Sequence, residues 1–509
     1  MEIQNINTYK EPVYLFTNWN LIDAGRTLFP IDRSNVPEEI LRDLIRLESK
    51  YQVKLEEGRK PPELLNLASG VTIFIEKAEK SVRWLLPEKP WEKRLGHCSL
   101  LWEQGKYRLW YTADYKLGEI IEIEQERFTM EYGACLCYAE STDGFNWERP
   151  SLGLCEYEGS KDNNIVSFDP LLVNGTVFLD EHAPEEERYK LIGGAKLRYL
   201  SPKATSGGAL VGAVSPNGFH WSPFSEPLCI HISDTQQVAY FDEKLCKYVG
   251  YFRSNYQRRR SISRSETEDF RHWPVPQIIL TPGPEEMPSD DFYTNGYTKY
   301  PETTCTHLMF SSIYHRDKDT VDVRLASSVD GIAWNWVSKE SIIELGKPGE
   351  WDSGTIYPSP QMVFLSGQHV AVPVQGNSHL HNEYWRSIFE KNYSDQNGLG
   401  WAIWEEGRIT GIQARQRGEF TTLPIPVSGN RLEMNFKTGK AGFVKVEFLR
   451  GDNSAIEGYI SADCEPLQGD QIWGTVIWKN GTNISQLQGN FARLRVTMFD
   501  AKVYGFRFR

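Results

Sequence analysis

A seven-residue pattern, Ser-x-Asp/Asn-Gly-x-x-Trp, recurs along the middle of the chain and constrains its fold more than any other feature. Its copies are Ser141–Trp147, Ser215–Trp221 and Ser328–Trp334, with a copy two residues longer at Ser265–Trp273. Asp-Gly or Asn-Gly supplies the positive φ of a tight hairpin, and the tryptophan begins the next strand with a large apolar face. The copies lie about 50 to 75 residues apart, which suits a repeated sheet of about four strands. Four unrelated hairpins are the alternative.

A second pattern, a strand followed by a short polar turn and another strand, lies upstream of the hairpins. Its copies are Ser99–Tyr111, Val177–Ile192, Val238–Tyr251, Thr306–Phe310 and Gln361–Val372. Each copy reads as the inner part of one sheet, and the Ser-to-Trp hairpin links later strands of the same sheet. Five copies between residues 91 and 410 predict a five-bladed β-propeller. We expect the last blade to close on Trp401–Trp404 with help from the N-terminal strand.

The regions on either side of this repeat have different patterns. Residues 1–90 predict a short extension with a strand at Val13–Trp19 and one amphipathic helix, which begins near Pro37. The helix presents an apolar face for packing on the rest of the protein or on a partner: Ile40, Leu44, Leu47 and Tyr51. Residues 411–509 contain strands of alternating polarity at regular intervals, which predict a separate β-sandwich. The fold class is therefore all-β, a propeller followed by a sandwich.

The composition and charge of the chain argue against several classes of partner. The chain has 68 acidic and 56 basic residues, a formal charge of -12, which disfavours nucleic acid and anionic membranes. No apolar run is long enough to span a bilayer and the start lacks a signal-peptide pattern, so we expect a soluble, cytoplasmic protein. The eight cysteines show no zinc-ligand spacing. Cys135 and Cys137 share one strand face, where a disulfide is sterically poor. We expect neither a metal nor a cofactor.

The candidate site follows from the geometry of a propeller. The innermost strand of every blade starts at one mouth of the central channel, so residues just ahead of these strands converge. This rule selects four candidate catalytic carboxylates: Asp234, Asp291, Asp352 and, as an alternative acid, Glu350. It also selects candidate substrate contacts: Arg94, His97, Asn174, Gln236, Tyr293 and Tyr357. Paired carboxylates cleave glycosidic bonds, and aromatic rings stack on sugars. The alternative for each Asp is a residue that caps its own turn.

Two further groups of side chains are candidates for binding. One group is a basic cluster that suits an anionic ligand, formed by Arg258–Arg260 and Arg264. A solvated hairpin edge is the more common explanation for such a run of arginines. His379 and His381 suit a metal if they lie on one strand face, but a polar loop is the simpler interpretation. The sequence has no phosphate-binding glycine loop and no Gly-x-Ser-x-Gly elbow.

Four stretches carry a family resemblance: Ser141–Leu154, Gly159–Val166, Trp351–Tyr357 and Gly418–Thr422. From about residue 91 onward the chain resembles bacterial propeller proteins grouped with the glycoside hydrolase family thirty-two N-terminal domain. The resemblance implies a five-bladed propeller with an appended sandwich, acting on fructosides, arabinosides or related sugars. The Trp-Met-Asn-Asp-Pro-Asn-Gly start, the Arg-Asp-Pro motif and the Glu-Cys motif of invertases have no counterpart here. The catalytic residues of invertases are therefore not carried over.

The leading hypothesis is a glycoside hydrolase that uses paired carboxylates on a carbohydrate substrate. A glycoside phosphorylase is an alternative, which requires a basic pocket for phosphate beside one acid. A propeller that only binds carbohydrate and a biosynthetic enzyme with a non-sugar substrate are two others. The oligomeric state is left open by the sequence.

Overall fold

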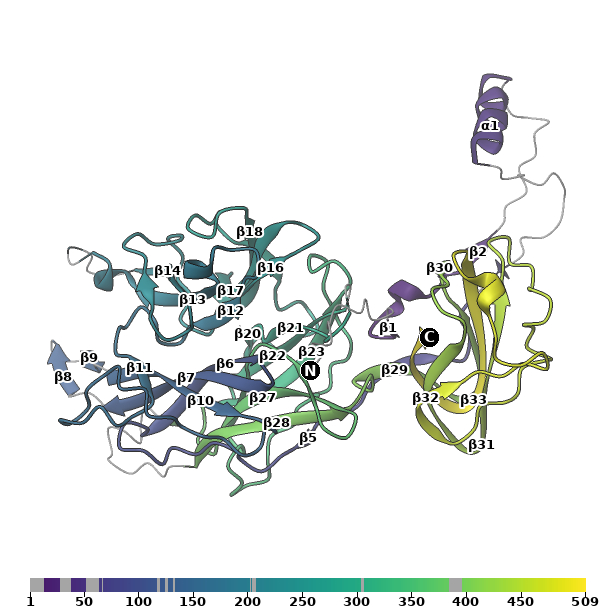
Figure 1. Cartoon of the computed structure of the whole chain (residues 1–509). Coiled ribbons are helices and arrows are strands. Elements are labelled where there is room, and N and C mark those ends of the chain that lie inside the picture. The colour runs from purple at the N-terminus through teal and green to yellow at the C-terminus, as the bar shows by residue number, and fades with distance from the viewer. Residues whose placement is uncertain are drawn as a thin grey trace. The chain divides into compact units, whose positions relative to one another are not determined.

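The computed structural model is nearly all β and forms two compact units (Figure 1). It describes residues 13–27, 38–51, 64–65, 67–116, 120–123, 127–130, 133–201, 203, 207–303, 306–383 and 396–509. One unit comprises residues 75–409, and the other comprises residues 1–74 with 410–509. Sequence analysis expected boundaries at residues 91 and 411 and a separate N-terminal extension. In the structure, residues 1–74 belong to the same unit as the C-terminal hundred residues.

The first three sheets of the 75–409 unit are antiparallel and contain four strands each. In spatial order the first comprises β11 (Ile165–Ser167), β10 (Gly133–Ser141), β7 (Lys106–Lys116) and β6 (Arg94–Glu103). The second comprises β12 (Thr176–Leu179), β13 (Tyr189–Lys196), β14 (Gly208–Ser215) and β15 (Ser222–Pro223). The third comprises β16 (Val238–Asp242), β17 (Lys247–Tyr256), β18 (Arg259–Thr267) and β19 (Gln277–Leu280). The expected repeat of about four strands is confirmed for these sheets.

The remaining strands of this unit form two further sets, joined by one parallel pairing between Val321 and Thr355. The fourth set contains β20 (Asp290–Thr294), β21 (Tyr297–Lys299), β22 (His307–His315), β23 (Thr320–Ser328) and β24 (Asn335–Trp336). The fifth contains β25 (Thr355–Pro358), β26 (Val363–Leu365), β27 (His369–Asn377), β28 (Asn397–Glu405) and β5 (Glu79–Lys80). Minor elements are the β8–β9 hairpin (Ile120–Ile123 and Arg127–Met130), η3 (Glu185–Glu187) and η4 (Leu197–Tyr199).

The Ser-to-Trp pattern forms the predicted hairpins. β10, β14 and β23 each end at the serine of a copy, and the serine Oγ accepts a hydrogen bond from the glycine N–H at 2.9 Å. The glycines have φ of +80°, +79° and +70°, which side-chain-bearing residues rarely adopt. In each copy the tryptophan Nε1 donates to the carbonyl of the same glycine. Asp143, Asn217 and Asp330 are therefore turn formers, as expected.

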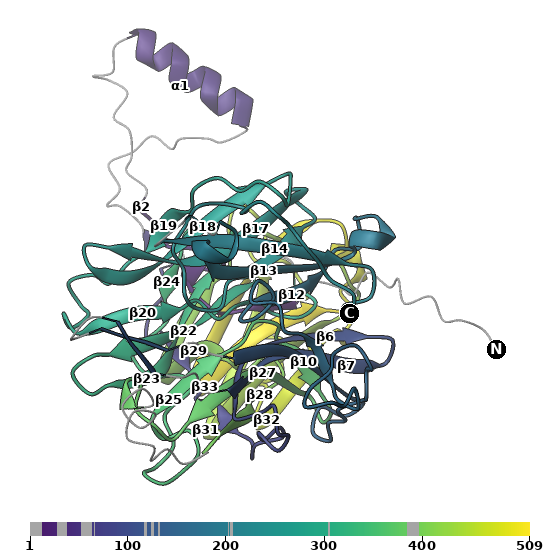
Figure 2. The ribbon, with the colours of Figure 1, turned by 90° about the vertical axis from the view of Figure 1, so that its left-hand side faces the viewer.

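These hairpins also join neighbouring sheets, because aromatic residues of one sheet donate to the hairpin glycine of another. Trp110 of the first sheet donates to Gly218 of the second at 2.7 Å, and Tyr251 of the third donates to Gly331 of the fourth at 2.8 Å. Trp401 of the fifth set donates to Gly144 of the first sheet at 2.8 Å. The last set thus packs on the first. Figure 2 shows the sheets following one another around the unit.

The hydrophobic core of this unit lies between successive sheets. One cluster joins the first and second sheets through residues such as Tyr138 and Leu191, and another joins the second and third through Phe178 and Phe252. A third joins the third and fourth, and a fourth joins Leu399 and Trp401 of the last set to Leu95 of the first sheet. Each sheet is therefore stabilised by its neighbours.

We expect Gly218→Ala to destabilise the 75–409 unit by about 2–5 kcal/mol, because strain at positive φ adds to overpacking of a full core. A Cβ at Gly218 would overlap the Trp110 ring. The matched control is Gly153→Ala, which also has a positive φ but has no atom within 4 Å of the added carbon. That variant should lose only about 1 kcal/mol. Urea-induced unfolding measures both losses, and equal losses would contradict the packing account.

The other unit contains a seven-stranded sheet, with central order β32-β31-β33-β29-β4. Its strands are β29 (Thr410–Thr421), β30 (Ile425–Pro426), β31 (Leu432–Leu449), β32 (Asp470–Thr475), β33 (Phe491–Phe508), β1 (Val13–Leu15) and β4 (Thr72–Ile75). Its core contains Phe436, Phe448, Val496, Met498 and Phe506. The strands predicted beyond residue 430 are confirmed, including the apolar positions that alternate toward the core. A short helix, η5 (Ser485–Leu487), follows β32.

The N-terminal elements correct one expectation. β1 pairs with β33 of its own unit, whereas β5 pairs with β28 and completes the fifth set. The strand at Val13 therefore does not help to close the last set. The predicted helix is present as α1 (Glu38–Tyr51), β2 (Arg26–Thr27) pairs with β3 (Leu64–Leu65), and η1 spans Trp19–Leu21. Pro37 lies outside the described residues.

Cys135 and Cys137 are free and buried, with their Sγ atoms 3.5 Å apart.

Candidate functional site

Polar and aromatic side chains meet where the inner strands of the 75–409 unit begin and the second strands end. Arg94 and His97 lie on β6, Arg253 lies on β17 and Arg260 on β18. We call the following set the arginine cluster: Arg94, His97, Asp234, Gln236, Arg253, Arg260, Asp291, Tyr293, Tyr314, Tyr357 and His381. Within one sheet, antiparallel pairing places the end of a second strand beside the start of the first, as in the pair Asp291 and Tyr314.

The ring of Tyr293 lies at the middle of this cluster. The guanidinium carbon of Arg253 is 4.9 Å from the ring centroid, and that of Arg260 is 5.0 Å from it. The rings of His381 and Tyr357 lie 4.8 Å and 5.8 Å from the same ring. Arginines at these distances from an aromatic ring gain a favourable cation–π interaction. The Tyr357 hydroxyl also lies 2.8 Å from Nδ1 of His381.

The two carboxylates of the cluster have different surroundings. Asp291 is fully buried and accepts four hydrogen bonds, from the backbone N–H and Nη1 of Arg260 and from Nε and Nη2 of Arg316. Both of its oxygens are therefore occupied. Asp234 forms an ion pair with Arg253, and 72% of its side chain is exposed. Of these two acids, only Asp234 is accessible to a substrate.

Several buried polar atoms of the cluster have no hydrogen-bond partner among the described residues. They are Nη1 of Arg253, Nδ1 of His97 and Oε1 of Gln236. Arg253 itself is only 6% exposed, and Gln236 is held in place because its Nε2 donates to the Cys98 carbonyl at 2.7 Å. Buried polar groups are normally hydrogen-bonded, so these atoms are available to bond a water molecule or a polar ligand.

Both histidines of the cluster are held neutral. Burial, together with the nearby guanidinium groups of Arg94 and Arg253, lowers the pKa of His97 to about 4. Burial, assisted mainly by Arg260, likewise lowers the pKa of His381 to about 4. Burial also lowers the pKa of Arg253. The cluster thus concentrates positive charge from arginines and leaves its imidazoles as neutral hydrogen-bonding groups.

We expect the free energy of unfolding to fall as the pH is lowered from about 6.5 to about 4. In that range the unfolded chain protonates a histidine whose ordinary pKa is 6.5, whereas the folded chain keeps His97 and His381 neutral. The stabilisation is complete above pH 6.5 and is lost as the pH falls. His97→Gln should show a shallower dependence, measured by urea unfolding at several pH values. The exposed His220→Gln, whose ring contacts the neutral Asn217, should match the wild type, and an unchanged slope in His97→Gln would contradict this assignment.

Seven of the ten predicted site residues lie in the cluster: Arg94, His97, Asp234, Gln236, Asp291, Tyr293 and Tyr357. Asn174 lies in the turn before β12, where its backbone N–H donates to Thr112 Oγ1 at 2.8 Å, and none of the contacts described for it reaches the cluster. Its φ of +57° fits a turn residue. The two remaining acids, Asp352 and Glu350, line a separate pocket that contains no residue of the cluster.

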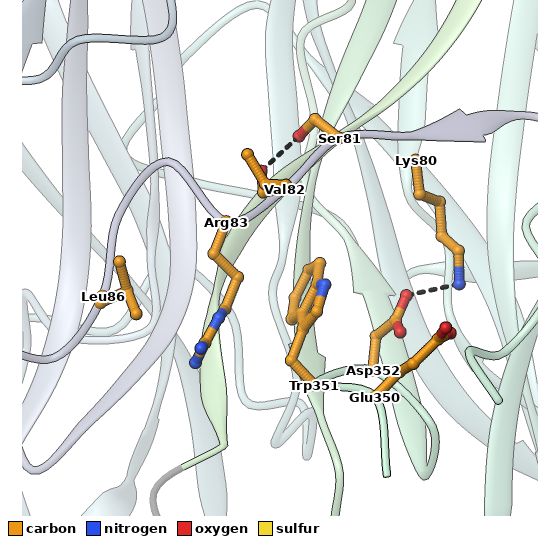
Figure 3. A pocket seen from close by; sticks show the side chains of 8 residues that line it. All are labelled: Lys80, Ser81, Val82, Arg83, Leu86, Glu350, Trp351 and Asp352. Carbon is orange, nitrogen blue, oxygen red and sulfur yellow. Dashed lines mark hydrogen bonds and ion pairs between the residues drawn. The ribbon is translucent and has the colours of Figure 1, made fainter. Parts of the chain in front are cut away.

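That pocket lies near the fifth set of strands and has a volume of about 500 Å³ (Figure 3). Asp352 is buried and forms an ion pair with Lys80 of β5 at 2.5 Å. Glu350 accepts a hydrogen bond from the Lys347 N–H at 2.7 Å. The pocket is lined by Lys80, Ser81, Val82, Arg83, Leu86, Glu350, Trp351 and Asp352.

Sequence reasoning missed Arg253 and Tyr314 and gave little weight to Arg260 and His381. Arg260 is not on a solvated hairpin edge, because it holds Asp291 and packs on Tyr293. His381 binds Tyr357 in the loop after β27. Arg253 and Tyr314 lie near the end of a second strand, His381 lies in the loop that follows one, and Arg260 lies at the start of a third strand. A rule that selects these positions, besides the starts of inner strands, would have found them.

Two negative findings concern the described residues. No group of three or more His, Cys, Asp or Glu side chains in them is placed to hold a metal ion. None of the helices within the described ranges combines the length and the apolar character needed to cross a membrane.

No protein-family model matches the chain, and no curated protein sequence matches it. One similar solved structure is an N-acetylgalactosamine deacetylase from F. plautii in complex with blood group B trisaccharide (13% identity, TM-score 0.43, 67% of this chain and 97% of that chain). Another is a β-1,2-mannobiose phosphorylase from Listeria innocua (11% identity, TM-score 0.44, 66% and 98%). A third is a glycoside hydrolase family 43 arabinoxylan arabinofuranohydrolase from Bacillus subtilis (10% identity, TM-score 0.38, 84% and 99%). The function proposed for the chain rests on its own residues.

Proposed function

We propose that residues 75–409 form a five-bladed β-propeller and that the other unit is a β-sandwich. Four-stranded antiparallel sheets and the hydrogen bond from Trp401 to Gly144, which links the last set to the first, support the propeller. The long, alternating strands β31 and β33 around one apolar core support the sandwich. The arginine cluster then lies at one mouth of the propeller channel.

We propose further that the arginine cluster cleaves a glycosidic bond with phosphate as the attacking group. The observation that carries this proposal is the charge arrangement, in which the cluster contains three arginines and one accessible acid, Asp234, which pairs with Arg253. A hydrolase with paired carboxylates needs a second acid free to attack or to activate water. Asp291 is engaged by two arginines and does not meet that need. The phosphorylase alternative, one acid beside a basic site, fits the cluster better than the hydrolase hypothesis does.

Seven residues of the cluster have a defined part in this reaction. Arg94, Arg253 and Arg260 hold the phosphate dianion, and Asp291 positions Arg260 for this task. Tyr293 and Tyr357 contact the sugar. When phosphate replaces Asp234 on Arg253, the carboxyl group stands beside an anion, which favours the form that carries a proton. Asp234 then serves as the general acid.

The proposed reaction is a single displacement, in which one bond forms, one bond breaks and one proton is transferred. A phosphate oxygen forms a bond to the anomeric carbon while the bond from that carbon to the glycosidic oxygen breaks. The Asp234 carboxyl group donates its proton to the departing oxygen. The products are a sugar phosphorylated at its anomeric carbon and the released alcohol or shortened glycoside, and Asp234 recovers a proton from solvent.

The test is to assay a panel of fructosides, arabinosides, mannosides and glucosides with and without inorganic phosphate. We expect turnover to require phosphate and to yield a sugar phosphate. Asp234→Asn should lower kcat by at least about 10²-fold, because it removes general acid catalysis, while circular dichroism shows an intact fold. Equal turnover without phosphate would replace this proposal with hydrolysis. Sugar binding without any turnover would indicate a carbohydrate-binding protein, and full activity of Asp234→Asn would exclude Asp234 as the acid.

A further inference from the structure

One side of the pocket beside β5 is formed by the ring of Trp351, which packs on the backbone of two strands. The ring of Trp351 lies against Gly376 of β27 and Gly400 of β28, where a Cβ at Gly400 would come within 3.0 Å of the ring. Arg83 lies against Gly398 of β28, and its Nη1 donates to the Asn397 carbonyl at 3.0 Å. Glycines at these positions leave room for both side chains. Figure 3 shows the Arg83 and Trp351 side chains projecting to the same side of the segment that carries Ser81 and Val82.

The charges around this pocket balance. Lys80 and Arg83 are cationic, Glu350 and Asp352 are anionic, and Lys80 is paired with Asp352 at 2.5 Å. A pocket of this kind has no net attraction for an anion or a cation. It still offers hydrogen-bonding groups on both sides of the Trp351 ring. Next to them, Val82 is 83% exposed, and Leu86 adds apolar surface. Exposed apolar surface with convergent polar groups is typical of a ligand site.

We propose that this tryptophan pocket binds a segment of a neutral oligosaccharide outside the arginine cluster. A sugar ring has one apolar C–H face and a rim of hydroxyl groups. The face would lie on Trp351 and Val82, and the hydroxyls would reach Glu350, Arg83 and Ser81. For its ligand class the inference rests on the proposed function, since both sites take the same kind of substrate. Glu350 and Asp352 are then sugar-binding and positioning residues in place of catalytic acids.

The experiment follows the indole N–H signal of Trp351 by NMR in the full chain labelled with ¹⁵N-tryptophan, assigned with Trp351→Phe. The probes are neutral tetrasaccharides of glucose, mannose, arabinose and fructose, with tetragalacturonate as the anionic comparison. We expect at least one neutral probe to shift this signal. Val82→Glu, which adds charge and bulk at an exposed position, should weaken that binding at least tenfold. The control Val275→Glu changes another exposed valine, which is not part of the pocket, and should bind like the wild type.

A double variant separates the pocket proposal from the proposed function. In Asp234→Asn/Arg253→Gln, whose changes are confined to the arginine cluster, the Trp351 signal should still shift, which supports a distinct site. Glycoside turnover with no shift of the Trp351 signal by any neutral probe would overturn the pocket proposal and leave the proposed function standing. A shift that persists in Val82→Glu, or a shift by tetragalacturonate alone, would also overturn it.

Discussion

Arg253→Gln is expected to lower kcat/KM for phosphate-dependent glycoside cleavage by about 10²–10³-fold, because preorganised charge at the reacting group is worth several kcal/mol. Arg253 is the most buried arginine of the cluster, stacks on Tyr293 and has an Nη1 atom without a partner among the described residues. Glutamine keeps a polar side chain of moderate size but removes the charge. Most of the loss should therefore appear as a higher KM for phosphate.

Initial rates measured over a range of phosphate concentrations check this result. Arg271→Gln is the matched control, because Arg271 precedes β19 of the same sheet and forms an exposed ion pair with Glu187. Its kinetics should equal those of the wild type, since exposed ion pairs contribute little. If Arg253→Gln keeps the wild-type KM for phosphate, the anion does not bind at this arginine and the assignment of the cluster is wrong.

Trp401→Ala is expected to lower the free energy of unfolding by about 3–5 kcal/mol, the typical cost of removing a large aromatic side chain from a core. Trp401 is fully buried, its ring centroid lies 5.2 Å from that of Trp84, and its Nε1 donates to Gly144. The substitution leaves a cavity and removes the hydrogen bond that Trp401 donates to the Gly144 carbonyl. It also weakens the contact between the last set of strands and the first.

Urea-induced unfolding measures this loss, fitted with two transitions because the chain forms two compact units. Trp401→Phe should lose less, about 1–3 kcal/mol, because it retains most of the ring and gives up mainly the N–H donor. Trp102→Ala is the control: Trp102 is 55% exposed and should cost about 1 kcal/mol or less. A small loss for Trp401→Ala would mean that the contact between the last and first sets contributes little to stability.

The strands and hairpins of the chain could be predicted because local chemistry determines them. Asp-Gly turns, alternating apolar residues and the position of Pro37 indicated the hairpins, the C-terminal strands and helix α1. Pairings between distant segments could not be predicted in the same way. β5 joins β28 across more than 300 residues, and β1 joins β33 across nearly the whole chain. Short strands carry too little sequence information to specify such partners.

The candidate site was predicted in part for a similar reason. The rule for inner strands selected Asp234, Asp291 and Tyr293, which lie in the same arginine cluster, because it depends only on where strands begin. The rule took no account of the cations that lie opposite them. Arg253 lies near the end of β17, Arg260 at the start of β18 and Arg316 just after β22. Only the tertiary structure shows that Arg260 and Arg316 occupy Asp291.

By itself, the sequence determined the repeat, the all-β character and the region where polar residues gather, since turn geometry and polarity act over a few residues. The tertiary structure decided the chemistry of that region. A carboxylate can serve as a catalytic acid or as a partner for arginine, and its surroundings determine which. Asp291 and Asp234 are equally plausible acids in the sequence. In the folded chain, one is buried between two arginines and the other is open to a substrate.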